Sequence, residues 1–185
     1  VLYQLSFSKG GVYISLYEDT TQSVKIKKGA EVVTKAAHDM SADVLIIEMG
    51  SNGGWDDYDE LISQYKAMIA NSGTQCYIII GDTDNPDEAI DSENYNSSKE
   101  VGLNDTLWEA ALREAFGDHF INMRTYLMQN ALDITGKEAN ETDIENLLDG
   151  RIPDSIKYDY THLNGYGYYA YGVGVYEKGV ELGYW

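Results

Sequence analysis

Three short apolar runs, separated by stretches of helical periodicity, constrain the fold of this chain most. Residues 42–50 (ADVLIIEMG), 76–81 (CYIIIG) and 120–124 (FINMR) are each apolar over a few residues and lack strict alternation. Such runs are typical of strands buried on both faces of a parallel sheet. Apolar residues recur at helical spacing in 56–71, and 165–181 predicts a last helix. The order predicts an α/β protein with an open parallel sheet and helices on both faces.

The first 30 residues have a different pattern. LSFS and VYISLY alternate as strands do, and KGG between them (Lys9 to Gly11) is a hairpin turn signal. A further alternating piece, SVKIK, follows. We therefore predict a β meander over 1–30, as the tail of an insertion or of an upstream segment, and a separate α/β domain over 31–185.

Charge narrows the classes of partner. The 185 residues include 13 Lys and Arg against 31 Asp and Glu, a formal net charge of −18. Phosphate backbones and anionic membrane surfaces are bound by basic clusters, so we expect neither nucleic acid nor membrane as a partner. No apolar run reaches the roughly 18 residues that indicate a spanning helix. One cysteine, Cys76, excludes an internal disulfide, and no motif predicts a metal or a cofactor. The oligomeric state stays open.

A D-x-x-H spacing precedes the last predicted helix. A histidine that acts as a general base needs its other ring nitrogen held by an acceptor, usually a carboxylate. Asp159 and His162 have a spacing that allows this in a turn, with Asn164 and Gly165 opening the helix behind them. We expect Nδ1 of His162 to donate a hydrogen bond to the Asp159 carboxylate. The same spacing also occurs by chance in polar turns.

A glycine-rich segment, MGSNGGW at 49–55, follows the first predicted parallel strand. Glycines let backbone N–H groups approach a substrate closely, and Asn52 adds a side-chain NH₂. Gly50 and Asn52 are thus candidates for an oxyanion hole, in a cleft shared with His162. Alternatively, Asn52 caps the helix that begins nearby. Trp55 either walls the pocket or packs at the start of that helix.

These two motifs, in this order, resemble the SGNH (GDSL-type) hydrolases, and in particular bacterial carbohydrate-esterase members. G-x-N matches Gly50 to Asn52, and D-x-x-H matches Asp159 to His162. The similarity extends through FGDHFINMRTYL, GRIPDSI and the ending EKGVELGYW, over about residues 30–185. It implies a three-layer, flavodoxin-like α/β fold, with His162 as general base, Asp159 as its orienting partner and Asn52 as oxyanion donor.

The nucleophile that this resemblance implies has no clear counterpart. The family carries it in a G-D-S block, and the chain contains no such sequence. Ser8 stands at the corresponding place but precedes a hairpin turn, so we expect an ordinary strand residue. Gly81-Asp82-Thr83 mimics the block at the wrong topological place, which indicates a loop threonine. We expect the serine block to lie upstream of Val1; the alternative is a diverged member without it.

The sequence leaves two functions open. The first is a serine esterase, a secreted acylhydrolase that removes small acyl groups such as acetyl, with carbohydrate esters as candidate substrates. The second is a non-catalytic binding or scaffold domain of the same fold. Sixteen tyrosines against three phenylalanines favour an exported, carbohydrate-facing protein, so we expect an extracellular or cell-surface location. His38 and His119 have no partner motif and are expected to be solvated surface residues.

Overall fold

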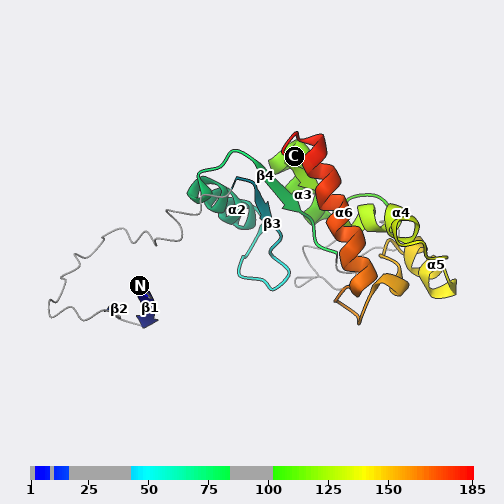
Figure 1. Cartoon of the computed structure of the whole chain (residues 1–185), viewed down its shortest axis with the longest axis horizontal. Helices are drawn as coiled ribbons and strands as arrows, with labels where there is room; N and C mark the ends of the chain where they lie inside the picture. Colours follow the sequence, from blue (N-terminus) through cyan, green and yellow to red (C-terminus); the bar gives the residue numbers. More distant parts are fainter. Residues whose placement is uncertain (1–2, 9–10, 17–42, 84–101) are drawn as a thin grey trace. The chain divides into compact units, whose positions relative to one another are not determined.

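A parallel sheet forms the centre of the α/β part of the chain (Figure 1). In the computed structural model it has the order β3–β4–β5, with β3 at Leu45–Ile47, β4 at Tyr77–Ile80 and β5 at Phe120–Ile121. Both pairings are parallel, with Ile46 opposite Ile78 and Ile80 opposite Ile121. The α/β character and the three parallel strands predicted from the apolar runs are therefore confirmed. The expectation that each strand is buried on both faces is wrong for β3, at the edge of the sheet, because Ile46 is 45% exposed.

The structure describes residues 3–8, 11–16, 43–83 and 102–185. They belong to two compact units, Val1–His38 and Asp39–Trp185. In the first unit, β1 (Tyr3–Ser8) pairs antiparallel with β2 (Gly11–Leu16), and Ser8 lies opposite Gly11. This confirms the predicted hairpin, whereas the third alternating piece, at 23–27, lies outside the described residues.

Helices follow each strand of the second unit, and their ends have clear local causes. The α-helices are α2 (Tyr58–Ser72), α3 (Leu107–Phe116), α4 (Met123–Thr135), α5 (Glu141–Leu148) and α6 (Gly165–Glu181). Short 3₁₀ turns lie at Gly117–His119 and Asp154–Ile156. The Asp57 side chain caps α2, which stops at Gly73 in the left-handed conformation. The predicted bounds of α6 are confirmed. No helix among those described is long and apolar enough to cross a membrane.

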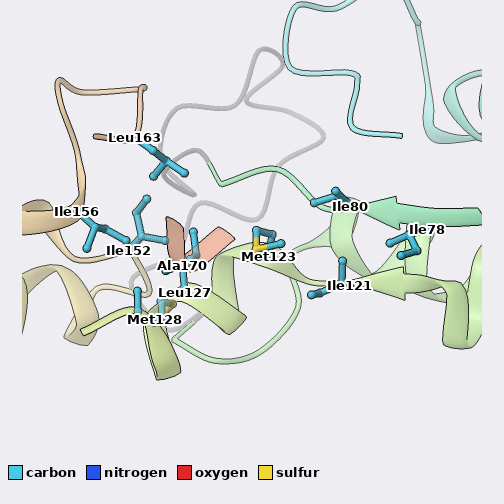
Figure 2. Close-up of a cluster of buried hydrophobic side chains, with 11 residues drawn as sticks. Ile78, Ile80, Ile121, Met123, Leu127, Met128, Ile152, Ile156, Leu163 and Ala170 are labelled. Carbon is cyan, nitrogen blue, oxygen red and sulfur yellow. The ribbon is translucent and has the colours of Figure 1, made fainter. Parts of the chain in front are cut away.

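Alternate residues of β4 enter two different hydrophobic clusters. Ile78 and Ile80 pack with residues of α4 and α6, including the fully buried Leu127 and Ala170 (Figure 2). Ile79, between them, packs with residues of α2 and α3 such as Leu61, Tyr65 and Leu112. Successive side chains of a strand point to opposite faces, so the central strand is apolar throughout.

The predicted strand at 120–124 is wrong in its second half. Only Phe120 and Ile121 pair with β4, and Asn122 then caps α4 by accepting a hydrogen bond from the Thr125 N–H at 3.0 Å. Met123 and Arg124 are therefore helical. Both are fully buried, which explains why their segment has the composition of a buried strand.

Candidate functional site

A polar cavity of about 400 Å³ lies beyond the ends of β3 and β4. Among the described residues, three segments form its wall: the loop after β3, the start of the loop after β4, and the turn that leads into α6 together with the first turns of that helix. Its described lining residues are Glu48, Ser51, Asn52, Asp82, Thr83, Thr161, His162, Leu163, Tyr168 and Tyr171. The cavity thus brings together Asn52 and His162, which are 110 positions apart in the sequence, as we expected.

The expected hydrogen bond between Asp159 and His162 is present. His162 Nδ1 lies 2.9 Å from both carboxylate oxygens of Asp159. A carboxylate can only accept, so Nδ1 carries a proton, and in the neutral imidazole the lone pair is then on Nε2. The side chains are 47% exposed for Asp159 and 68% exposed for His162, so the imidazole is accessible to a ligand. This arrangement suits a general base with a fixed tautomer.

The pKa of Asp159 is lowered to about 2. The main cause is the backbone N–H of His162, which donates to Asp159 Oδ1 at 2.8 Å, followed by the imidazole itself. The backbone N–H of Thr161 donates to the same oxygen at 3.0 Å. Hydrogen bonds to the charged form of a carboxyl group favour that form. Asp159 therefore stays ionised while it shapes the turn that carries His162.

The turn around His162 is anchored on both sides. The Tyr158 N–H donates to the His162 carbonyl oxygen at 2.8 Å, and the Asn164 N–H donates to Ile156 at 2.9 Å. Leu163, next to His162, is buried in the core. The Asn164 side chain caps α6 and donates to the carbonyl oxygens of Ser155 and Lys157 at 2.9 and 3.0 Å. His162 is therefore exposed on a turn that has little freedom.

The loop after β3 is held by aromatic side chains beneath it. The buried Tyr65 hydroxyl donates to the Met49 carbonyl oxygen at 2.8 Å and accepts from the Met49 N–H at 3.2 Å. Burial raises the pKa of Tyr65 to about 12, so it remains a donor. Gly50 has φ +114°, and an added Cβ would lie 2.7 Å from Trp108 Cζ2. Trp55 Nε1 donates to the Gly50 carbonyl oxygen at 2.9 Å.

These contacts decide between the alternatives for the loop. Asn52 does not cap α2, because Asp57 accepts the hydrogen bond from the Glu60 N–H at 2.8 Å; the capping alternative is wrong. Trp55 packs against Tyr58 and Trp108 and is not among the described residues that line the cavity. Gly50 is not among these lining residues either, and a larger residue at this position would clash with Trp108. Its part in an oxyanion hole stays a prediction.

Sequence reasoning missed Glu48 and Tyr171. The Tyr171 hydroxyl donates to Glu48 Oε2 at 2.8 Å across 123 positions of sequence. Glu48 is open to the cavity, but the protein around its carboxyl group raises its pKa, and the charge of Asp82 adds to this shift. Burial, and then Glu48, raises the pKa of Tyr171. A carboxylate directly after an apolar run that predicts a strand was the available signal for Glu48.

The two hydroxyl candidates have different outcomes. Ser8 ends β1 in the first unit, in the hairpin that was expected. Thr83 does lie in a loop, as predicted, but that loop forms part of the cavity wall. Its topological place after β4 therefore does not keep it away from His162.

The prediction for His119 is wrong. This residue is half-buried and stacks on Tyr77 with ring centroids 4.0 Å apart. Its Nδ1 lies 3.0 Å from the Tyr77 carbonyl oxygen and 3.0 Å from the Tyr184 hydroxyl. It therefore joins the start of β4 to the end of the chain. His38 lies outside the described residues.

Within the part of the chain that the structure describes, no group of three or more His, Cys, Asp or Glu is arranged to hold a metal ion.

Comparison of the chain with family models, with curated proteins and with solved structures found no match.

Proposed function

We propose that this chain carries the base and oxyanion parts of a serine ester hydrolase of the SGNH type, with a three-layer fold. The observation that carries the proposal is one cavity lined by both His162 and Asn52, with His162 Nδ1 hydrogen-bonded to Asp159 at 2.9 Å. An activated hydroxyl, a base and an oxyanion donor are the groups that acyl transfer requires.

In this reaction His162 Nε2 takes the proton of a hydroxyl nucleophile as its oxygen attacks the ester carbonyl carbon. The negative charge that develops on the carbonyl oxygen is stabilised by the Asn52 side-chain N–H. Asp159 holds the imidazole and stabilises the imidazolium. His162 then returns the proton to the departing alcohol, and a water, activated in the same way, releases the acid. We propose small acyl groups such as acetyl, carried by a carbohydrate outside the cell.

The nucleophile decides between this function and its alternative. The proposal takes it to be a serine of a G-D-S block, which this sequence lacks. That absence favours a second candidate, a binding or scaffold domain of the same fold that does not turn over. In that case the cavity would bind a ligand without cleaving it.

The test is hydrolysis of p-nitrophenyl acetate by a preparation that includes any residues encoded before Val1. We expect His162→Ala to lower kcat by orders of magnitude and Asn52→Ala by roughly 10²- to 10³-fold. Lys66→Ala, an exposed change on α2, serves as the matched control and should have no effect.

A fluorophosphonate probe, located by peptide mass spectrometry, would identify the nucleophile. We expect one labelled serine, with labelling lost in His162→Ala. Ser8→Ala should leave both labelling and turnover unchanged. Turnover that survives His162→Ala would refute the proposed base, and neither labelling nor turnover across several acyl esters would favour the non-catalytic domain.

A further inference from the structure

The charges around the cavity point to the kind of substrate it accepts. Glu48 and Asp82 both line it, one after β3 and the other after β4. No Lys or Arg is among the described lining residues. The described groups that line the cavity are carboxyl groups, hydroxyl groups, an amide, the imidazole of His162 and the apolar side chain of Leu163.

Asp82 lies close enough to Glu48 for its charge to act on the Glu48 carboxyl group. The charge of Asp82 disfavours the ionised form of Glu48, in addition to the effect of partial burial. The same repulsion acts on any third anion that enters the cavity, because a concave wall of low polarisability concentrates the field of one sign.

Glu48 also has hydrogen-bonding capacity left for a ligand. The Tyr171 hydroxyl donates to Oε2 at 2.8 Å, whereas a carboxylate can accept at both oxygens. An alcohol or ammonium group can donate to such an acceptor, but a carboxylate ligand cannot. The cavity therefore offers favourable contacts to donors and unfavourable ones to anions.

We propose that Glu48 and Asp82 make this cavity selective for uncharged or cationic substrates rich in hydroxyl or amino groups, and that they exclude esters with a carboxylate near the reacting carbonyl. This inference deepens the proposed function and rests on it, because the bound molecule is a substrate only if the protein is a hydrolase. By this selectivity, acetylated neutral or amino sugars are accepted, and esters of uronic acids or of dicarboxylic acids are rejected.

A matched pair of alkylating reagents tests the selectivity without any nucleophilic serine. Iodoacetamide is neutral and iodoacetate is anionic, and both alkylate the exposed imidazole of His162 with loss of iodide and a proton. The rate of each at His162 is measured by peptide mass spectrometry. In Glu48→Gln/Asp82→Asn we expect the ratio of the iodoacetate rate to the iodoacetamide rate to rise by roughly three- to tenfold.

Controls separate the local field from the overall charge. Asp118→Asn/Asp133→Asn also removes two negative charges, from exposed positions that do not line the cavity, and should change the ratio by less than twofold. In the unsubstituted chain, 0.5 M salt should raise the ratio, because salt screens exposed charges. If the double cavity variant does not fold, Glu48→Gln alone gives the same comparison, with a smaller rise in the ratio.

An equal rise in both double variants, or no change with salt, would overturn the proposal. Comparison of p-nitrophenyl acetate with the p-nitrophenyl monoester of succinate, in an active preparation, gives the corresponding ratio of kcat/KM. A charge-dependent alkylation ratio without any esterase activity would leave the cavity selectivity intact and refute the proposed hydrolase. Esterase activity without a preference for uncharged esters would support the proposed hydrolase and refute the cavity selectivity.

Discussion

Replacing Arg124 by methionine should strongly destabilise the second unit. Arg124 is fully buried, and its guanidinium makes a two-pronged contact with Glu109, at 2.7 Å from Nε to Oε1 and 2.7 Å from Nη2 to Oε2. Its remaining N–H groups donate to the carbonyl oxygens of Gly102, Gly150 and Asn104 at 2.7 to 2.8 Å. All the donors of a guanidinium are used.

The magnitude follows from what the substitution leaves behind. Arg124→Met keeps most of the volume but removes the charge opposite Glu109, which is 4% exposed. Breaking one partner of a buried ion pair costs about 3–5 kcal/mol, and the three carbonyl oxygens lose donors as well. A domain is typically stable by only about 5–15 kcal/mol. We therefore expect a loss of at least about 3 kcal/mol.

Urea unfolding followed by circular dichroism measures this loss from the midpoint and slope. Arg124→Lys keeps the charge but not the planar fork of the guanidinium. Its free energy of unfolding should lie between those of the unsubstituted chain and Arg124→Met, and it should stay measurable if the methionine variant does not fold. Replacing Glu109 by glutamine should cost less free energy of unfolding in the Arg124→Met variant than in the unsubstituted chain, because in that variant it removes an unpaired buried carboxylate. A loss below about 1 kcal/mol, or strictly additive effects, would refute the reasoning.

Three further predictions concern the site and its supports. The carboxyl group of Asp159 should titrate near pH 2 by NMR, and a midpoint at or above 3.8 would contradict the hydrogen bonds described. Because this folded-state pKa lies below the ordinary 3.8, the stabilising effect of the ionised carboxylate is complete above about pH 5 and is lost as the pH falls towards 2. Gly50→Ala should lower the free energy of unfolding in urea by about 2–4 kcal/mol, because it combines positive φ with a clash against Trp108. Gly54→Ala also has positive φ but meets open space, so it should cost less, and equal losses would exclude the clash. Asn164→Ala should cost about 1–3 kcal/mol through the lost helix cap and two lost loop contacts, and an unchanged urea midpoint would show that these contacts do not hold the turn.

The sheet was predictable because each strand is apolar for a local reason. A central parallel strand such as β4 is buried on both faces, so its residues must be apolar at every position, and this pattern is visible in a short window. The bounds of α2 and α6 were equally accessible, since Gly73 and Asn164 act on the nearest turn. The same logic failed at Met123 and Arg124, where a buried first turn of helix looks like a strand.

Buried polar contacts were not predictable from local patterns. Arg124 meets Glu109 across 15 positions, and His119 meets Tyr184 across 65. Charged and imidazole side chains are mostly exposed, so the expectation for a lone His119 was a surface position. Which buried polar groups find partners depends on where the chain returns, and no periodicity records that.

The sequence by itself determined the Asp159–His162 pair, because three residues of one turn can meet without help from the rest of the chain. It also determined the parallel sheet and the negative charge. That Asn52 shares a cavity with His162 was predicted, but only the tertiary structure decided that Glu48 and Tyr171 meet there as well. Strands that run in parallel bring their carboxyl ends to one edge, and packing of α6 against β4 then carries Tyr171 to Glu48. Those contacts join segments more than 100 residues apart, so they exist only after the core has formed.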